Sequence, residues 1–492
     1  MVNVLLDRYE IKKYQAGLKM VMYVAVKKLF NCDVFYMHSL DKGLYCKIDT
    51  EKKLTINDIN NLKKYMDEII AKDLKINKKV ITIKDAYNFY LKNNELEKAN
   101  NLLYSNDKVA TIYELCGFYN YFLSDMPAST GCLNKYNITF LENNDLVLTT
   151  IYSDEFEIPR FNNQDIILKS FTDYNKWCKL VKVNYISDVN MLISESKIKE
   201  FIKKNDIMMD NQIFELASLI RKENKKLILL GGPSSSGKTT STKKLALYMS
   251  AIGLNPIYLG LDDYFKERED SPKDAEGNYD FESIDCIDLE LFNKQLEDIL
   301  DGKEVSVPTY NFVLGKKEYL NRIIKLKEND IILIEGLHCL NEELTSNIPK
   351  EKKLKVYISP FMPLSIDRHN HISTVDIRLM RRIVRDNRTR GKNVIDTLES
   401  WDKVRSGEIK NVFPFTNEAN VVLNTAYIYE IGVLRIYVEP LLYSVPIDSK
   451  YYNESRRLID ELQMFFPIPG DYLADGNVLR EFVGGSYFER GE

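Results

Sequence analysis

One stretch of this sequence combines glycines, hydroxyl side chains and a lysine at a spacing suited to binding phosphate. Residues 226–241 read KLILLGGPSSSGKTTS and contain the pattern G-x-x-x-x-G-K-T between an apolar run and a helical run. Glycines let backbone N–H groups converge on phosphate oxygens, and the amino end of the helix adds partial positive charge. The alternative is a chance Gly/Ser-rich turn, which the flanking segments argue against. The residues expected to bind a nucleotide are Gly232, Pro233, Ser234, Ser235, Ser236, Gly237, Lys238, Thr239 and Thr240.

Two acidic positions follow apolar runs further along the chain. Asp262 and Asp263 come after PIYLG (256–260), and Glu335 comes after IILI (331–334). Open α/β sheets bind ligands beyond the carboxyl ends of their strands, so a carboxylate at 262 can take the proton of an attacking hydroxyl. Glu335, together with the Thr239 hydroxyl, is suited to holding Mg²⁺. Solvated acidic turns are the alternative at both places, and the acidic pair alone does not decide the matter.

A strongly basic segment, DIRLMRRIVRDNRTRGK (376–392), is the fourth candidate. Arg378, Arg382 and Arg385 share one helix face at spacings of four and three. Phosphoryl transfer depends on positioning and charge neutralisation, for which arginines are well suited. A solvated charged face and an RNA-binding patch are the alternatives. Because this segment lies downstream of a phosphate loop, we favour the interpretation that it forms a lid over the bound phosphates.

Short apolar runs alternate with helical stretches in the part of the chain that must position these residues. Runs that are apolar on both faces are typical of central parallel strands, so we predict a doubly wound α/β sheet. The runs are KLILL (226–230), PIYLG (256–260), IILIEG (331–336), KVYIS (355–359) and NVVLN (420–424).

The rest of the chain divides by composition and periodicity. Residues 1–185 are predicted as an α+β domain, with a one-sided apolar helix over 18–29, short strands at 33–39 and 43–50, and a helix capped by Thr55. We expect a helical connector at 186–225, the phosphate-loop domain at 226–430 and a helical extension at 431–492.

Composition excludes several classes of protein. The chain has 492 residues with 45% hydrophobic and 28% charged residues and a net charge of −4, which excludes disorder, collagen and a general nucleic-acid coat. No run of 18 apolar residues or signal-peptide core occurs, so no membrane partner is expected. The seven cysteines are scattered without a C-x-x-C pair, which indicates reduced thiols in a cytoplasmic protein.

These segments, in this order, resemble the uridine kinase/phosphoribulokinase family over residues 226–426. The similar motifs are GPSSSGKTT, LDDYFK, YDFESIDCIDLELF, VPTYNF, EGLHCLN and RRIVRDNRTRG. The resemblance implies a P-loop NTPase fold and an ATP- and Mg²⁺-dependent kinase that phosphorylates the 5′-hydroxyl of a nucleoside. It implies Asp262 as general base, Glu282 and Tyr310 as substrate-binding residues, Thr239 and Glu335 as metal ligands, and Arg382, Arg385 and Arg390 as lid groups.

Substrate recognition departs from the family pattern. The family's sugar-binding acid is Asp where this chain has Glu282, and a base-reading His is replaced by Gly315. A kinase for another small metabolite, such as a sugar phosphate, therefore stays open. A second rival is an RNA-binding protein whose ATP site only switches conformation, although an intact Asp262 argues against it. Residue types alone do not separate ATP from GTP as donor.

The first 150 residues are similar to the second additional, editing-type domain of threonyl-tRNA synthetase. AVKKLF, GLYCKID, KKYMDEIIAKDLKI and YELCGFYNYFLSDMPASTGCLNKYNI follow the order of that domain. Its H-x-x-x-H and C-x-x-x-H motifs fall on Ala16 with Met20 and on Cys116 with Asn120. The resemblance thus implies a fold without hydrolytic or metal chemistry. RNA, a nucleoside, the kinase domain and a second copy of the chain stay open as its partners.

Overall fold

Five parallel strands form one sheet, in the order β18-β15-β8-β14-β9. They are β8 (Leu227–Gly231), β9 (Asn255–Tyr258), β14 (Asp330–Gly336), β15 (Lys353–Ser359) and β18 (Val421–Asn424). Each coincides with one of the apolar runs, so the predicted parallel α/β sheet is confirmed. The residues of β8 and β15 are all buried, as are the first five of β14, which is typical of the central strands of a parallel sheet that is covered on two sides.

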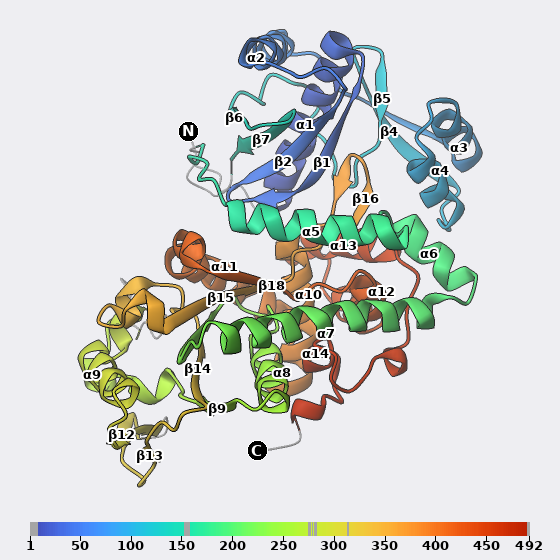
Figure 1. The fold of residues 1–492 in the computed structure, drawn as a ribbon. Coiled ribbons are helices and arrows are strands. Elements are labelled where there is room, and N and C mark those ends of the chain that lie inside the picture. Colours follow the sequence, from blue (N-terminus) through green and yellow to red (C-terminus); the bar gives the residue numbers. More distant parts are fainter. Residues whose placement is uncertain are drawn as a thin grey trace. The chain divides into compact units, whose positions relative to one another are not determined.

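Helices cover both faces of this sheet (Figure 1). Ile228 and Leu230 of β8 pack with α7 (Ile198–Lys222) and α8 (Lys238–Ala251). Leu227 and Leu229 point to the other face and pack with α9 (Leu289–Leu300). Alternate residues of one strand therefore enter two separate cores. The C-terminal part of α7, expected only as a connector, is one of the covering helices.

The computed structural model describes residues 8–151, 158–273, 277, 279, 283–311 and 314–489, and the chain divides into two units. Unit 1 comprises Met1–Lys199, Met362–Ile377 and Ile428–Pro469. Unit 2 comprises Glu200–Phe361, Arg378–Tyr427 and Gly470–Glu492, and contains the parallel sheet. Residues 431–492, expected as one extension, are shared between the two units.

Further elements of unit 2 surround the sheet. They are α11 (Val394–Asn411), α14 (Arg480–Val483), β10 (Val305–Ser306), β11 (Thr309–Asn311), β12 (Lys316–Glu318) and β13 (Ile323–Ile324). Strand β10 pairs with β13, and β11 pairs with β12, both antiparallel. The helix α10 (Thr374–Arg390) begins in unit 1 and belongs to unit 2 from Arg378 onward.

Unit 1 is an α+β structure with two antiparallel sheets, ordered β1-β2-β7-β6 and β3-β4-β5. The strands are β1 (Asp33–Leu40), β2 (Gly43–Asp49), β3 (Asn77–Thr82), β4 (Val109–Leu115), β5 (Phe118–Asn120), β6 (Tyr136–Phe140) and β7 (Asp145–Thr150). The helices are α1 (Arg8–Phe30), α2 (Ile56–Ala71), α3 (Ile83–Lys92), α4 (Leu96–Leu103), α5 (Asp165–Val181), α6 (Ile186–Ser194), α12 (Glu430–Tyr443) and α13 (Tyr452–Gln463). The similarity to a threonyl-tRNA synthetase domain stays a prediction.

The sequence correctly predicted the amino-terminal cap of α2, but its prediction of one apolar face for α1 was incomplete. The Thr55 hydroxyl accepts a hydrogen bond from Asp58 N, and the Asp58 side chain accepts one from Thr55 N, which forms a capping box. The helix α1 was expected to have one apolar face. Residues 20–26 are instead buried without a break, so this helix lies in the middle of the core of unit 1.

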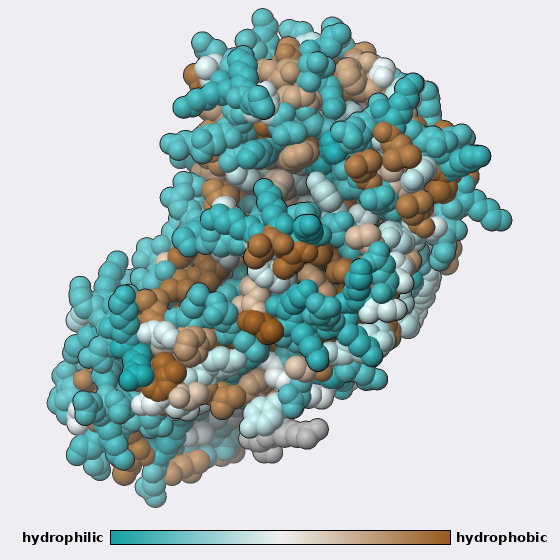
Figure 2. Space-filling view, turned by 45° about the vertical axis from the view of Figure 1, so that its right-hand side comes forward, coloured by the Kyte–Doolittle hydropathy of each residue, from teal (hydrophilic) through white to brown (hydrophobic). Residues whose placement is uncertain are grey.

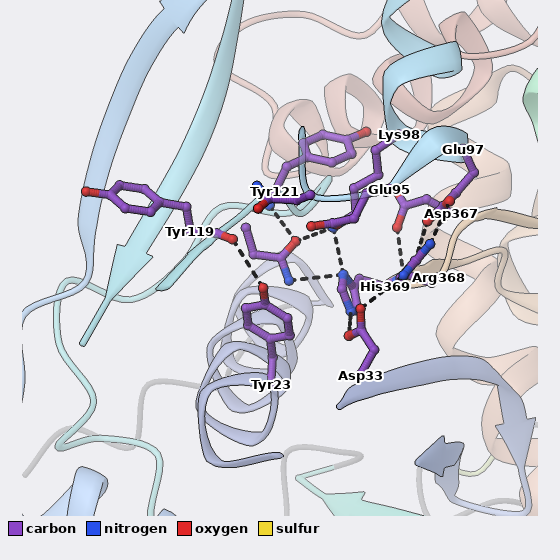
Figure 3. A network of polar contacts seen from close by, with 12 residues as sticks. Tyr23, Asp33, Glu95, Glu97, Lys98, Tyr119, Tyr121, Asp367, Arg368 and His369 are labelled. Atoms are coloured by element: carbon purple, nitrogen blue, oxygen red, sulfur yellow. Dashed lines mark hydrogen bonds and ion pairs between the residues drawn. The ribbon is translucent and has the colours of Figure 1, made fainter. Parts of the chain in front are cut away.

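The short hairpin of β16 (Ser365–Asp367) and β17 (Asn370–His371) is also part of unit 1. His369 is fully buried, and its two ring nitrogens lie 2.9 Å from Asp33 Oδ1 and 2.7 Å from Lys98 Nζ. Figure 3 shows this polar network, in which Arg368 also contacts Glu97 and Asp33. A segment 271 to 336 residues away in sequence from these partners therefore completes the interior of the N-terminal unit.

The surface is mainly hydrophilic in the view of Figure 2, with scattered apolar side chains. Among the described residues, none of the helices combines the length and the hydropathy needed to cross a membrane.

Candidate active site

The predicted phosphate loop connects β8 to α8. Ser235 and Gly237 have φ values of +58° and +82°, which fold the loop back on itself. A Cβ atom at Gly232 would lie 2.2 Å from the carbonyl oxygen of Ile358, so glycine is required there. These two glycines are the first and last of the motif, and both are needed for the shape of the loop.

Lys238, the first residue of α8, lies over the loop. Its Nζ donates hydrogen bonds to the carbonyl oxygens of Gly232 and Pro233, both at 2.9 Å. Burial lowers the pKa of this ammonium group, whereas Glu335, Glu481 and other carboxylates oppose that shift. The hydroxyl groups of Ser235 and Ser236 are buried and have no hydrogen-bond partner among the residues that the structure describes. Such groups are costly unless a ligand satisfies them, which suits an anion-binding loop.

A hydroxyl and a carboxylate meet beside the loop. Thr239 Oγ1 donates to Glu335 Oε1 at 2.8 Å, and Glu335 Oε2 is buried without a hydrogen-bond partner. Parallel pairing of β14 with β8 places Glu335 next to Leu230, so both side chains lie at the carboxyl edge of the sheet. Two hard oxygen donors with a free lone pair are a donor set that fits Mg²⁺.

The two acidic residues after β9, Asp262 and Asp263, differ in their contacts. Asp263 Oδ2 accepts from Arg322 Nη1 at 2.9 Å, and its Oδ1 accepts from Tyr310 N at 3.3 Å. The carboxylate of Asp262 makes no such hydrogen bond or ion pair within the described part of the chain, and the residue is exposed. Partial loss of hydration beside the surrounding protein atoms raises the pKa of Asp262, and the negative charges of Asp263 and Glu335 raise it further. A poorly neutralised carboxylate with a raised pKa is suited to accept a proton.

The substrate side of the site is partly described. Tyr310 lies on β11, is mostly buried, and stacks edge-on against Phe265 with ring centroids 5.7 Å apart. Glu282 lies outside the described residues. Gly315 has a φ of +68°, and a Cβ atom there would lie 2.8 Å from the Arg268 Cβ. The position that carries a histidine in the resembled family therefore has no room for one in this backbone.

The three predicted lid arginines share one buried carboxylate, Asp386. Its oxygens lie 3.2 Å from Arg382 Nε, 3.2 Å from Arg385 Nη2 and 3.4 Å from Arg390 Nη1. Arg382 Nη1 also donates to Ser234 Oγ at 2.9 Å, so it is joined to the phosphate loop. Within the described part of the chain, no hydrogen bond or ion pair joins Arg385 or Arg390 to the loop.

Several residues that hold the loop were not singled out from the sequence. Arg381 is fully buried and donates to the carbonyl oxygen of Thr425, whose hydroxyl donates to Ser236 O at 2.6 Å. Glu408 accepts from Ser234 N at 2.9 Å, and Glu481 accepts from Thr240 N at 3.4 Å. Arg381 belongs to the basic segment, but nothing local in the sequence marks Thr425, Glu408 and Glu481, because each contacts the loop or the start of α8 across 174 to 241 residues.

Of the four positions that replace the synthetase motif, three are buried and one is exposed. Ala16 and Met20 are buried in α1, and Cys116 is exposed on a turn. Asn120 is buried at the end of β5, where its Nδ2 lies 3.1 Å from His369 Nδ1.

Comparisons with known proteins agree with this geometry. Residues 227–429 match the model of the Phosphoribulokinase / Uridine kinase family. The matched range contains the phosphate loop, both acidic positions and the basic helix.

This region belongs to the phosphoribulokinase/uridine kinase family. Uridine kinases of Borrelia duttonii and Anoxybacillus flavithermus are similar to it, with 28% and 26% identity. Each alignment covers 40% of this chain, and they cover 85% and 86% of those proteins. A solved structure from Bacillus stearothermophilus, named as a possible uridine kinase, is 19% identical with a TM-score of 0.24 and covers 40% of this chain and 88% of that one. The protein is an ATP-dependent kinase of a small molecule, and residues 227–429 form its kinase region.

Proposed function

We propose that the protein transfers the γ-phosphoryl group of ATP to the 5′-hydroxyl of a nucleoside. The observation that carries the proposal is the arrangement of three chemical groups beyond the carboxyl ends of neighbouring strands. The phosphate loop follows β8, the unneutralised Asp262 follows β9, and Glu335 lies at the end of β14 beside Thr239. Donor binding, metal binding and proton acceptance are thereby available at one edge of the sheet.

The chain's residues then act in the following way. Lys238 and the loop amides hold the β- and γ-phosphates, and the Ser235 and Ser236 hydroxyls gain their missing partners. Thr239 and Glu335 would hold Mg²⁺, which when bound would neutralise part of the phosphate charge. Asp262 takes the proton of the acceptor hydroxyl. The oxygen of that hydroxyl forms a bond to the γ-phosphorus, and the bond between the γ-phosphorus and the bridging oxygen of ADP breaks. Arg382, Arg385 and Arg390 stabilise the charge of the transferring group.

The acceptor side is proposed from the family resemblance. Tyr310 lies against the residues that follow Asp263, because its N–H is held by that carboxylate. Glu282 would bind the vicinal hydroxyls of a ribose, so ribonucleosides are expected to be better acceptors than 2′-deoxynucleosides. Gly315 offers only backbone groups, so discrimination between pyrimidines and purines is expected to be looser than with a histidine at this position.

The test is ADP release measured with a panel of acceptors, with mass analysis of the product. The panel contains uridine, cytidine, adenosine, inosine, their 2′-deoxy forms and several sugar phosphates. We expect 5′-monophosphates from ribonucleosides and no product from Lys238→Ala at unchanged melting temperature. Turnover of sugar phosphates alone would favour the alternative metabolite kinase. Absence of every acceptor-dependent product would overturn the proposal. RNA or a second copy as partner, and a cytoplasmic location, stay predictions.

A further inference from the structure

Ser234, the third residue of the phosphate-loop motif, has all three of its polar groups held by protein. Its N–H donates to Glu408 Oε1 at 2.9 Å, and its carbonyl oxygen accepts from Arg378 Nε at 2.9 Å. Its hydroxyl accepts from Arg382 Nη1 at 2.9 Å. The next two residues differ, because the hydroxyls of Ser235 and Ser236 are buried without partners. The loop thus has a fixed point at Ser234, followed by a part whose groups are available to a ligand.

The groups that hold the Ser234 backbone form a buried ion pair. Glu408 on α11 and Arg378 on α10 are each 1% exposed, and Arg378 Nη2 contacts the same Glu408 oxygen that accepts from Ser234. The second oxygen of Glu408 accepts from Arg405 Nη1 at 2.9 Å. Arg378 and Arg405 outweigh the burial that disfavours the charged form and so lower the pKa of Glu408. Two charges are therefore kept in the interior beside the loop, where their desolvation is costly.

We propose that Glu408 and Arg378 are positioning residues for the donor nucleotide. They fix both backbone polar groups of Ser234, so that the amides from Ser235 to Thr239 converge on the β- and γ-phosphates before ATP arrives. Neither residue needs to touch the nucleotide. The inference assigns to Arg378 a different role from the lid arginines on the same helix, and it rests on the proposed function.

A buried pair can also be needed only for folding, so the variants must separate the two roles. Removing one partner leaves an uncompensated buried charge, whereas replacing both with apolar side chains of similar volume is often tolerated. The double variant Arg378→Met/Glu408→Leu removes both contacts to the Ser234 backbone. The double variant Arg378→Met/Glu408→Gln keeps an acceptor oxygen for Ser234 N. The comparison of these two measures the value of that hydrogen bond in a background without the charge pair.

A matched control is available on the opposite edge of the sheet. Asp330 is 4% exposed and accepts from Asn255 Nδ2 and Lys327 N at 2.8 and 2.9 Å, at the start of β14. Asp330→Asn therefore disturbs a buried carboxylate of unit 2 without contact to the phosphate loop. The change in kcat/KM for ATP in this variant shows how much activity is lost when unit 2 is destabilised away from the phosphate loop.

The measurements are the melting temperature, the Kd for ATP, and KM and kcat for ATP and for the acceptor. We expect Arg378→Met/Glu408→Leu to fold and to lose about 10- to 100-fold in kcat/KM for ATP, since a small misplacement of reacting groups has that cost. The acceptor KM should be unchanged, and Arg378→Met/Glu408→Gln should recover part of the loss. Undiminished kcat/KM for ATP in the Leu variant, or an equal loss in Asp330→Asn, would overturn the inference. Failure of the unaltered protein to bind ATP would instead overturn the proposed function.

Discussion

At the scale of single residues, Asp262 and Asp263 differ in what they contact. Because Asp263 is occupied by Arg322 and by Tyr310 N, only Asp262 is available as a base. We expect Asp262→Asn to lower kcat about 10²- to 10⁴-fold, the usual contribution of a positioned base, with little change in the Kd for ATP. Asp263→Asn is the matched control and should mainly lower the melting temperature. Equal losses of ATP binding and kcat in Asp262→Asn would show a metal-binding or structural role instead.

His38 in unit 1 allows a prediction on pH. Its ring stacks on Phe171 with centroids 3.5 Å apart, and burial lowers its pKa to about 3, against the opposing hydrogen bond to Ser39 O. The folded state therefore keeps His38 neutral, while the unfolded chain takes up a proton below a pKa of about 6.5. Between about pH 6 and pH 4 this group removes about 1.4 kcal/mol of unfolding free energy per pH unit of acidification.

The variant His38→Phe cannot take up this proton. Its unfolding free energy should fall less steeply with acidification than that of the unaltered protein, by about one proton's slope between pH 6 and pH 4. Urea titrations at several pH values measure both slopes. Parallel curves for the two proteins would mean that His38 is protonated in the folded state too.

At the scale of elements, the C-terminal segment around α14 reaches the amino end of α8. Glu481 accepts from Thr240 N at 3.4 Å, whereas Arg388 of α10 donates to the carbonyl oxygens of Glu481 and Phe482. Phosphates bound in the loop would accept hydrogen bonds from backbone amides at the same end of α8. The Glu481 carboxylate and the nucleotide therefore compete for the positive charge at this helix end. We expect Glu481→Gln to bind ATP about 2- to 5-fold more tightly, in keeping with the worth of a charge at a helix terminus.

Glu489 provides the control for Glu481. Its carboxylate pairs with Arg388 at 2.5 Å and, among the described residues, makes no hydrogen bond or ion pair with α8. Glu489→Gln should leave the Kd for ATP unchanged, as measured by calorimetry alongside Glu481→Gln. Weaker ATP binding in Glu481→Gln would show that this carboxylate caps α8 in the nucleotide-bound state as well.

At the scale of the whole molecule, unit 1 depends on residues that follow β15 in the chain. His369, Arg368 and their neighbours are bonded in its interior to Asp33, Lys98 and Glu97. A chain shortened to residues 186–492 would lose all three of these partners. We expect it to be insoluble or aggregated, because buried polar groups without partners are costly.

A milder variant tests the same dependence in the full chain. Asp33→Ala removes the carboxylate shared by Arg368 and His369 and should cost about 3–5 kcal/mol of unfolding free energy, as the loss of one partner of a buried ion pair does. Denaturant titration measures this change. A soluble and fully active 186–492 fragment, or an Asp33→Ala variant of unaltered stability, would contradict the expected dependence.

Local patterns in the sequence predicted most of the elements of the kinase region, and the chemistry assigned to its residues stays a prediction. Five apolar runs became five parallel strands, the glycine pattern became the phosphate loop, and Thr55 became a helix cap. Each of these depends on periodicity or on residues within a few positions of one another, so the information is local.

The partners that hold the phosphate loop and the interior of unit 1 could be identified only from the folded structure. Glu408 reaches Ser234 from 174 residues away, and Asp33 reaches His369 across 336 residues. The same holds for α1, which its periodicity predicted as a one-sided helix and which the core of unit 1 surrounds. Long-range contacts of this kind leave no spacing rule in the sequence, because a buried charge is placed by the packing of whole elements and not by its neighbours along the chain.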